Sequence, residues 1–393
     1  MGFSFKNFFT RQKGINPSDT VEEKEKKDYY DIGPIDETKA VYRLVIGQRS
    51  NGKTYSVCKH IIENYFKNGD RAAYIRRWDE DIQPKHLSSL FAPHIELIKE
   101  LSGGEYNGVF YRAKEFHLCY YDEEGKVEKK DPEAFCITAS INTAEHTKGQ
   151  DRGEIKLVLF DEFMTRGAYL TNEFIQYCNL LSSLIRNRED TIIYMCANTV
   201  NRYCPYFKEM GLKDVENMPQ GQIYVYTYAN ADLTVAVEYC DPVKATEKVA
   251  SKFFAFDNPQ LEMITTGAWE LQFYPRPPYK IYEQDIFKVF YVQFGESMLC
   301  CEIVHPQDRK HSNDLFIFVH PQTKDVEIND LTPFYTDSFS TSVCHVHFLN
   351  DQPTELHKLI AKLILKKSVC FSSNEVGEIW RNWLINDQNM NLY

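Results

Sequence analysis

The stretch from Gly47 to Thr54 reads Gly-Gln-Arg-Ser-Asn-Gly-Lys-Thr, and it decides the fold of the chain. It matches the phosphate-binding pattern G-x-x-x-x-G-K-[ST] without a mismatch. Val41 to Ile46, just before it, is a short apolar run that predicts a buried strand. Tyr55 to Phe66, just after it, carries apolar side chains at helical spacing. A strand, a glycine-containing loop and a helix in this order predict a phosphate-binding loop (P-loop).

The predicted loop suits phosphate chemically. Its backbone N–H groups can surround phosphate oxygens, and the helix N-terminus adds a positive dipole. Lys53 would reach the β- and γ-phosphates of a nucleotide, and Thr54 would hold Mg²⁺. We expect the following residues to bind the nucleotide: Gly47, Gln48, Arg49, Ser50, Asn51, Gly52, Lys53 and Thr54. The alternative is a chance match in a turn, which the flanking strand and helix disfavour.

Two acidic residues follow another apolar run. Lys156 to Phe160 predicts a buried strand, and Asp161 and Glu162 come directly after it. Asp161 can bind Mg²⁺ through water, and Glu162 can orient and deprotonate an attacking water, so the pair indicates hydrolysis. The alternative is a solvated strand end.

Two further polar residues end predicted elements. Asn198 follows the apolar strand predicted over residues 191–197. It could hydrogen-bond the γ-phosphate or the attacking water, or it could be a turn residue. Arg186 ends a helix predicted over residues 172–185. It could reach the nucleotide of a neighbouring subunit, or it could be a helix-end cation favoured by the dipole. The residues alone leave this choice open.

The composition of the chain excludes some classes of protein. The chain has 393 residues, 43% of them apolar, a net charge of −11 and eleven cysteines. The charge excludes a uniformly basic nucleic-acid-binding surface but not local basic loops. No apolar run is long enough for a membrane span, and the start lacks the features of a signal peptide. The cysteines are scattered without a C-x-x-C pair, which favours a reducing compartment.

The order of predicted elements suggests two domains. Residues 1–35 form a charged N-terminal arm, and residues 36–229 alternate strands with helices, which predicts a parallel α/β sheet. Residues 230–274 are expected to be a linker, helical in part. Residues 275–393 are expected to form a second, smaller α/β domain, mostly antiparallel, that ends in two helices.

Two stretches of the first domain receive specific predictions. Leu87 to Leu101 is predicted as one helix, and Val109 to Tyr121 as one arm of a hairpin. That hairpin would turn at Asp122-Glu123-Glu124-Gly125. The lysines at 126, 129 and 130 lie among glutamates, which favours a solvated turn over a DNA contact.

Several motifs occur together in a fixed order: residues 45–55, 74–77, 159–163 and 186–189, then Asn198 and residues 201–207. Over roughly residues 40–210 the chain resembles the DNA-encapsidation ATPases of short-tailed phages of the phi-twenty-nine type. The resemblance implies a motor that uses ATP and Mg²⁺ to move double-stranded DNA into a preformed capsid. It also implies a P-loop NTPase sheet of the additional-strand, catalytic-glutamate type.

The same resemblance implies partners and a location. The partners would be double-stranded DNA and the capsid portal, and the chain would form a homo-oligomeric ring, expected to have five subunits. It would act in the cytoplasm of the infected host cell, transiently on the procapsid, and would be absent from the mature virion. No membrane partner is expected. Whether a structural RNA joins the complex is left open.

The resemblance also assigns residues. Arg186 matches the trans-acting arginine finger of the family, and Arg49 matches an arginine within its phosphate loop. They join Glu162 and Asn198 as expected catalytic residues. Lys148 precedes the acidic strand, where the family places DNA-gripping residues. The longer N-terminal arm departs from the family pattern.

In that family the C-terminal domain resembles a ribonuclease-H-like nuclease that has lost its metal-binding acids. Here the expected first strand, Val289 to Phe294, contains no Asp or Glu, which supports a vestigial fold that binds without cutting. His345 and His347 would share one face of a strand and could ligate a metal. Without a third or fourth ligand nearby in the sequence, a structural role is favoured.

Other functions remain open. A terminase-type ATPase with an active nuclease would show three clustered acids on its C-terminal strands. A nucleotide-gated assembly protein would bind the portal and move nothing, so its ATP turnover would not respond to DNA. A filamentous-phage assembly ATPase is disfavoured because no membrane span is predicted.

Overall fold

The computed structural model describes residues 9–12, 29–144, 154–165, 167, 169–170, 172–186, 188–200, 204–229, 231–243, 252, 273–294, 297–306, 314–323, 331–336, 342–347, 349 and 351–386. The described residues divide into two compact units. The first holds the described residues up to 252 except 167, 169 and 170, and these three group with the described residues from 273 onward in the second.

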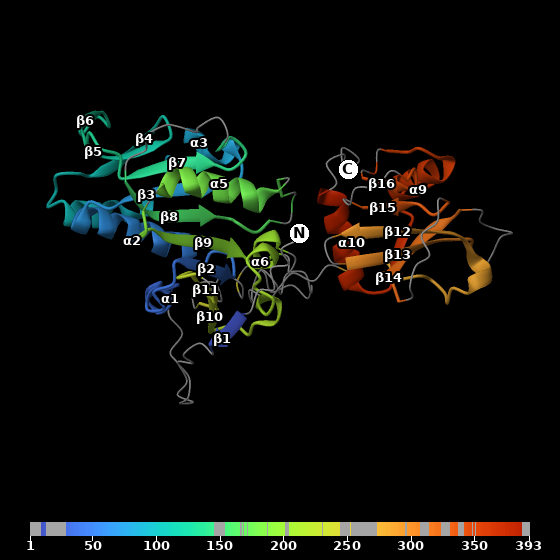
Figure 1. Ribbon diagram of the computed structural model, residues 1–393. Helices are drawn as coiled ribbons and strands as arrows, with labels where there is room; N and C mark the ends of the chain where they lie inside the picture. Colours follow the sequence, from blue (N-terminus) through green and yellow to red (C-terminus); the bar gives the residue numbers. More distant parts are fainter. Residues whose placement is uncertain are drawn as a thin grey trace. The chain divides into compact units, whose positions relative to one another are not determined.

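The first unit is built on a mixed sheet with the strand order β1-β10-β11-β2-β9-β8-β3-β7-β5-β4, and β6 pairs with β5 (Figure 1). The six strands from β11 to β7 run parallel, and the strands at both edges are antiparallel to their neighbours. The strands are β1 (Phe9–Gln12), β2 (Tyr42–Gly47), β3 (Arg71–Arg76), β4 (Gly108–Arg112), β5 (Glu115–Tyr121), β6 (Val127–Lys130), β7 (Cys136–Ser140), β8 (Ile155–Asp161), β9 (Ile192–Asn198), β10 (Gln222–Tyr228) and β11 (Thr234–Tyr239).

Strand β9 lies between β2, which leads into the P-loop, and β8, which ends in Asp161. This inserted strand is the additional-strand arrangement that we predicted. All three strands are buried along nearly their whole length, as their continuous apolar runs require. Because parallel strands end at the same edge, the sheet brings Gly47, Asp161 and Asn198 together.

Helices cover both faces of this sheet. The helices are α1 (Gly33–Asp36), α2 (Lys53–Asn68), α3 (Pro84–Leu87), α4 (Ile95–Leu101), α5 (Glu173–Ile185) and α6 (Pro205–Glu209). Short 3-10 turns occur at Asp79–Ile82, Ala92–His94 and Val215–Asn217. On one face Ile61 of α2 shares an apolar cluster with Val45 and Leu159. On the other face Tyr177 of α5 packs on Phe160, with ring centroids 4.9 Å apart.

Two predictions in the first unit are wrong in detail. The single helix predicted over residues 87–101 is broken, because Pro93 lies within it and the α-helical part begins only at Ile95. The predicted hairpin turn at residues 122–125 is confirmed, because β5 pairs with β6 across it, but the predicted arm over residues 109–121 is itself a hairpin, β4 against β5. It turns at Ala113 and Lys114, whose φ angles of 55° and 67° suit a tight hairpin. The sequence lacks the Asn-Gly or Asp-Gly signal that predicts such a turn.

The predicted domain boundary at residue 229 is also wrong. Strand β11 lies in the predicted linker, yet it pairs in parallel with β2 from Val235 to Tyr239 and completes the central sheet. Strand β1, in the predicted arm, pairs with β10. Strand β1 is only four residues long. Strand β11 has turn residues on both sides, but its place in the central sheet depends on its pairing with β2, which no local pattern shows. Most of the helix expected in residues 230–266 lies outside the described residues.

The second unit is built on a sheet with the order β16-β15-β12-β13-β14-β17. Strands β12, β13 and β14 are antiparallel, and β15, β16 and β17 are parallel to their neighbours. Three antiparallel strands continued by two parallel ones form the ribonuclease-H-like sheet that we expected. The elements are β12 (Ile286–Phe294), β13 (Ser297–Val304), β14 (Phe316–Pro321), β15 (Phe334–Tyr335), β16 (His345–Val346), α9 (Glu355–Leu365), β17 (Val369–Phe371) and α10 (Asn374–Asn386), with a 3-10 turn at Glu283–Asp285.

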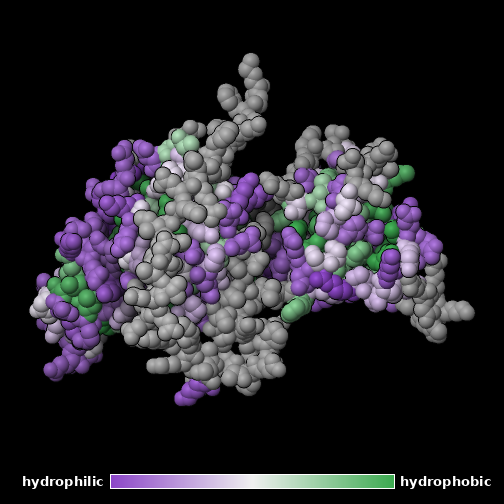
Figure 2. Space-filling model, turned by 90° about the horizontal axis from the view of Figure 1, so that it is seen from below, coloured by the Kyte–Doolittle hydropathy of each residue, from purple (hydrophilic) through white to green (hydrophobic). Residues whose placement is uncertain are grey.

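Helices α9 and α10 share the core of the second sheet, where Ile360 and Trp380 join Phe290 and Leu299. The described surface seen in Figure 2 is mostly hydrophilic, with hydrophobic residues showing between the polar ones. Among the described helices, none combines the length and the apolar character needed to cross a bilayer.

A buried ion pair joins β3 to α5 in the first unit. The side chains of Arg77 and Glu173 are only 5% and 1% exposed. Arg77 Nε and Nη2 donate to the two carboxylate oxygens of Glu173 at 2.8 and 2.9 Å. The Tyr206 hydroxyl donates to the same carboxylate at 2.8 Å. The pair therefore fixes the start of α5 against the end of β3.

Replacing Arg77 by methionine should destabilise the first unit by about 3–5 kcal/mol, because the Glu173 carboxylate would stay buried without its cation. Denaturant unfolding followed by circular dichroism measures this. The control is Lys126→Met, which breaks an exposed pair with Glu124 whose side chains are 74% and 73% exposed. It should cost less than about 1 kcal/mol. Equal losses in the two variants would contradict a structural role for the buried pair.

Candidate functional site

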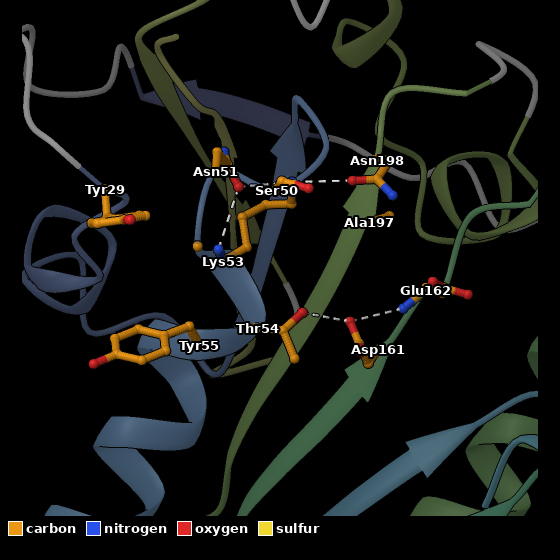
Figure 3. Close-up of a pocket in the computed structure, with 11 residues that line it drawn as sticks. Tyr29, Ser50, Asn51, Lys53, Thr54, Tyr55, Asp161, Glu162, Ala197 and Asn198 are labelled. Carbon is orange, nitrogen blue, oxygen red and sulfur yellow. Dashed lines mark hydrogen bonds between the residues drawn. The ribbon is translucent and has the colours of Figure 1, made fainter. Parts of the chain in front are cut away.

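A pocket of about 560 Å³ opens at the carboxyl edge of the central strands (Figure 3). The P-loop and the start of α2 form one wall, and the ends of β8 and β9 form the other. The described residues that line it are Tyr29, Ser50, Asn51, Gly52, Lys53, Thr54, Tyr55, Asp161, Glu162, Ala197 and Asn198. Residues far apart in the sequence therefore converge on one cavity.

The P-loop backbone adopts a left-handed conformation at Gly52, which glycine permits. Gly52 caps the N-terminus of α2 with a φ of 98°, in the left-handed region that favours glycine. The segment before α1 holds the loop from outside, because the backbone N–H of Tyr30 donates to the Asn51 carbonyl at 2.8 Å. Tyr29 was not singled out from the sequence, since its place in the pocket depends on this contact.

Lys53 is buried at the floor of the loop, with 6% of its surface exposed. Its Nζ donates to the Gln48 carbonyl at 2.6 Å and to Asn51 Oδ1 at 3.0 Å. Longer contacts of 3.4 Å reach the Gly47 carbonyl and Asn198 Oδ1. Burial lowers the pKa of this ammonium, and the nearby acidic groups, Asp161 among them, oppose that effect. The loop thus encloses one cation at the edge of the pocket.

Thr54 and Asp161 meet across the pocket. Thr54 Oγ1 donates to Asp161 Oδ1 at 2.9 Å, and the Tyr74 hydroxyl donates to Asp161 Oδ2 at 2.9 Å. Burial raises the pKa of Tyr74 well above its usual value, so the hydroxyl keeps its proton and remains a donor. Tyr74 was not predicted as a site residue, because its hydroxyl gains a role only from the neighbouring strand.

Glu162 follows Asp161 with a φ of 55°, which turns its side chain away from the strand direction. Figure 3 shows its carboxylate directed away from Thr54 and Lys53. Arg76 Nη2 donates to Glu162 Oε2 at 2.6 Å, and Arg76 Nη1 lies 3.5 Å from Asp161 Oδ2. Arg76 therefore links the two acids, a role that sequence reasoning did not give it.

The other predicted site residues lie in different places. Asn198 pairs in register with Gly47 at the end of β9 and lines the pocket. Arg49, at the exposed tip of the loop, and Arg186, at the exposed end of α5, are not among the described residues that line it. Gly47 and Gln48 contribute carbonyl groups to Lys53 rather than pocket surface. Lys148 lies outside the described residues.

Comparison with known proteins agrees with this geometry. Residues 24–248 match the family model of the podovirus DNA encapsidation protein (Gp16). The chain belongs to this family. The matched range contains every element that lines the pocket, from Tyr29 to Asn198.

Curated relatives of this encapsidation-family chain cover part of it. The DNA packaging protein of Bacillus phage B103 is 26% identical over 175 residues, which are 44% of this chain and 48% of that protein. The DNA packaging protein of Bacillus phage phi29 is 25% identical over 170 residues, 42% of this chain and 45% of that protein. The chain thus spans about half the length of the curated relatives it matches.

Solved structures extend the likeness in fold. The phi29 viral genome packaging motor assembly aligns with a TM-score of 0.53 and 16% identity, covering 91% of this chain and 100% of that one. The phi-28 gp11 DNA packaging motor aligns with a TM-score of 0.51 and 18% identity, covering 92% and 98%. At these identities the likeness concerns the fold.

Gly47, the first glycine of the loop, packs closely against Cys240, and substitutions can test how tight this contact is. A Cβ on Gly47 would lie 3.0 Å from the Cβ of Cys240, which follows β11. Gly47→Ala should therefore overpack this contact, which costs about 1–3 kcal/mol, and its φ of 157° adds backbone strain. The double variant with Cys240→Gly should recover the packing part of that loss but not the backbone strain. Denaturant midpoints of the single and double variants measure the coupling.

The control is Gly69→Ala at the end of α2, where an added Cβ meets no described atom within 4 Å. It should lose stability only through its φ of 75°. Adding Cys240→Gly to this control should give no recovery. Additive losses in both double variants would show that the Gly47–Cys240 contact is not tight.

Proposed function

We propose that this chain is an ATP-hydrolysing motor that moves double-stranded viral DNA into a preformed capsid through the portal. The observation that carries the proposal is the pocket whose lining brings together the buried Lys53, the Thr54–Asp161 pair and Glu162. The family match and the packaging proteins among the relatives support the DNA-moving part of the proposal.

The pocket fits a nucleotide with Mg²⁺. Its volume of about 560 Å³ lies within the range of small-molecule sites. The loop amides and the Lys53 ammonium would hold the β- and γ-phosphates. The Thr54 hydroxyl and the Asp161 carboxylate offer the hard oxygen ligands that Mg²⁺ prefers. When bound, Mg²⁺ would neutralise charge on the phosphates.

Glu162 would orient the attacking water and accept its proton. In this structure its carboxylate is paired with Arg76 at 2.6 Å. That hydrogen bond occupies Oε2, and the carboxylate is directed away from Thr54 and Lys53. The proposal therefore requires Glu162 to leave Arg76 when the water attacks. Asn198, at the end of β9, would hydrogen-bond the γ-phosphate or the water.

The remaining parts of the proposal concern assembly. Arg186 would act on the nucleotide of the next subunit in a homo-oligomeric ring, and Arg49 would act from its own loop. Lys148 would contact DNA. The ring, proposed to have five subunits, would dock on the portal in the cytoplasm of the infected host cell, and a structural RNA could belong to the complex.

Lys53→Ala should lose ATP binding and turnover, because no other group supplies the ammonium in the loop. Glu162→Gln should bind ATP but leave it unhydrolysed, because the amide cannot accept the proton. Binding of a fluorescent ATP analogue and phosphate release, measured with and without portal and DNA, check both. The matched control is Lys59→Ala, an exposed lysine on α2 paired with Glu63, which should keep both activities.

Two outcomes would count against the proposal. Normal turnover in a folded Lys53→Ala protein would remove the P-loop assignment. Wild-type protein that binds ATP but shows no DNA-stimulated turnover would favour a nucleotide-gated assembly protein instead. DNA cleavage by the full chain with Mg²⁺ or Mn²⁺ would favour the terminase-type enzyme.

Arg186→Ala should sharply reduce turnover in the assembled ring and leave ATP binding within a few-fold. Known arginine fingers contribute about 10³–10⁵ in rate, because they meet charge that develops only in the transition state. The isolated monomer should be slow with or without Arg186. The control is Arg188→Ala, since Arg188 Nη1 donates to the Leu184 carbonyl at 3.3 Å and acts as a helix-end cation. It should change turnover little.

Mixed rings separate action in trans from action in cis. A ring of Glu162→Gln and Arg186→Ala subunits contains interfaces where an intact Glu162 faces an intact Arg186 from the neighbour. Partial ATPase activity should therefore return, although each variant alone is inactive. Mixed rings of verified composition that stay inactive would contradict the trans assignment.

A further inference from the structure

The two faces of the second sheet differ in character. On β13, Leu299, Cys301 and Ile303 are buried in the core with α9 and α10. Because side chains alternate along a strand, Cys300 and Glu302 lie on the opposite face and are only half-buried. We call this face the outer face of the second sheet.

His320 of β14 completes a cluster on this face. It pairs in register with Cys300 across the antiparallel strands, so their side chains lie side by side. The ligand atoms of Cys300, Glu302 and His320 all lie within 4.8 Å of one another. Among the described residues this is the one such group of three or more His, Cys, Asp or Glu side chains.

The distances suit a tetrahedral metal ion. Metal–ligand bonds of about 2.0–2.3 Å at tetrahedral angles place ligand atoms about 3.4–3.6 Å apart. His320 Nε2 and Glu302 Oε1 are already 3.5 Å apart. Their side chains are 22% and 17% exposed, so the site is sheltered but reachable from solvent. The Cys300 sulfur lies within 4.8 Å of both atoms, so a small approach brings all three ligand atoms to the spacing of a tetrahedral site.

Contacts behind the cluster orient its ligands. His320 Nδ1 lies 2.9 Å from the Pro321 carbonyl, which can only accept a hydrogen bond. That contact places a proton on Nδ1 and directs Nε2 toward the cluster, as in metal-binding histidines. Phe318 lies 5.4 Å from the His320 ring, centroid to centroid, and limits its rotation. Tyr291 pairs in register with Cys300 on β12, so its side chain lies beside the thiol on the same face.

We propose that Cys300, Glu302 and His320 bind a zinc ion, with a fourth position open to water. A thiolate and an imidazole select zinc over magnesium or calcium, which prefer oxygen ligands alone. Three protein ligands with one open position are the pattern of a zinc site that exchanges its fourth ligand. The site is separate from the P-loop, and it uses none of the residues of β12, the strand expected to have lost its metal-binding acids.

Cobalt reports on such a site without any enzymatic assay. We expect the full-length protein, stripped of metal and kept in excess Mg²⁺ to occupy the P-loop site, to bind one equivalent of Co²⁺. Binding should give a near-ultraviolet thiolate-to-cobalt charge-transfer band and the visible bands of tetrahedral Co²⁺. One equivalent of Zn²⁺ should abolish both.

Substitutions of the three proposed ligands test whether the ion binds at this cluster. Cys300→Ser should lose the charge-transfer band, and Glu302→Gln and His320→Asn should weaken Zn²⁺ binding about 10-fold or more. The matched controls are Cys178→Ser, a half-buried cysteine on α5, and His345→Asn, a half-buried histidine on β16 of the same sheet. Both should bind like wild type, and circular dichroism checks that each variant is folded.

Two results would overturn the proposal: a wild-type protein that shows no thiolate band, or a band that Cys300→Ser leaves unchanged. A band lost equally in Cys178→Ser would mean that cobalt binds elsewhere, which also contradicts it. Because these readouts do not involve ATP or DNA, they succeed or fail independently of the motor function.

Discussion

The hydrogen bond from Thr54 to Asp161 ties the start of α2 to the end of β8 across the inserted strand β9. It depends on strand register, since Gly47 pairs with Asn198 and Asp161 pairs with Cys196. A slip of one residue on β8 would move Asp161 to the other face of the sheet. The buried apolar side chains of these strands oppose such a slip, because it would place them against the wrong helix. The packing of the sheet therefore sets the geometry of the site.

The sequence predicts those site residues that the residues next to them in the chain mark out. The P-loop and the Asp161-Glu162 pair were predictable, because each directly follows a continuous apolar run that can only be a doubly covered strand. Tyr74 and Arg76 were not, because their roles come from Asp161 and Glu162 at the end of β8, which lies beside β3 in space but is 87 and 86 residues away from them in the chain. Tyr29 was missed for the same reason.

The fold predictions failed where a local signal was weak or conflicted with another. The apolar spacing of residues 87–101 fits a helix, but Pro93 removes a backbone donor and restricts the preceding residue. The turn at Ala113 and Lys114 has positive φ angles, but it contains no glycine or asparagine from which they could be predicted. Strand β11 is six residues long, like β2, but its place in the sheet depends on a pairing with β2 that the local pattern does not show. In the last two cases strand pairing decides the structure, and a single sequence does not display it, whereas the break at Pro93 could be read from the sequence.

Adjacent arginines at the end of β3 serve two different purposes. Arg77 and Glu173 are both buried, so separating them would leave an unpaired charge in the protein interior. Arg76 pairs with Glu162, whose side chain is 57% exposed, and water can replace that pairing at little cost. The buried pair therefore fixes the strand end, while the exposed pair can open when a ligand arrives. The catalytic role that we propose for Glu162 needs the second kind of partner.

The two sheets place their polar side chains according to how many of their faces are covered. In the first sheet both faces of the central strands are covered by helices, so polar groups collect where the strands end, and the pocket forms at that edge. In the second sheet α9 and α10 share the core of one face, so β13 alternates buried apolar residues with half-buried polar ones. Cys300, Glu302 and His320 can therefore converge on the middle of a sheet face. A scan for polar residues after strands finds the first kind of site, and only strand register reveals the second.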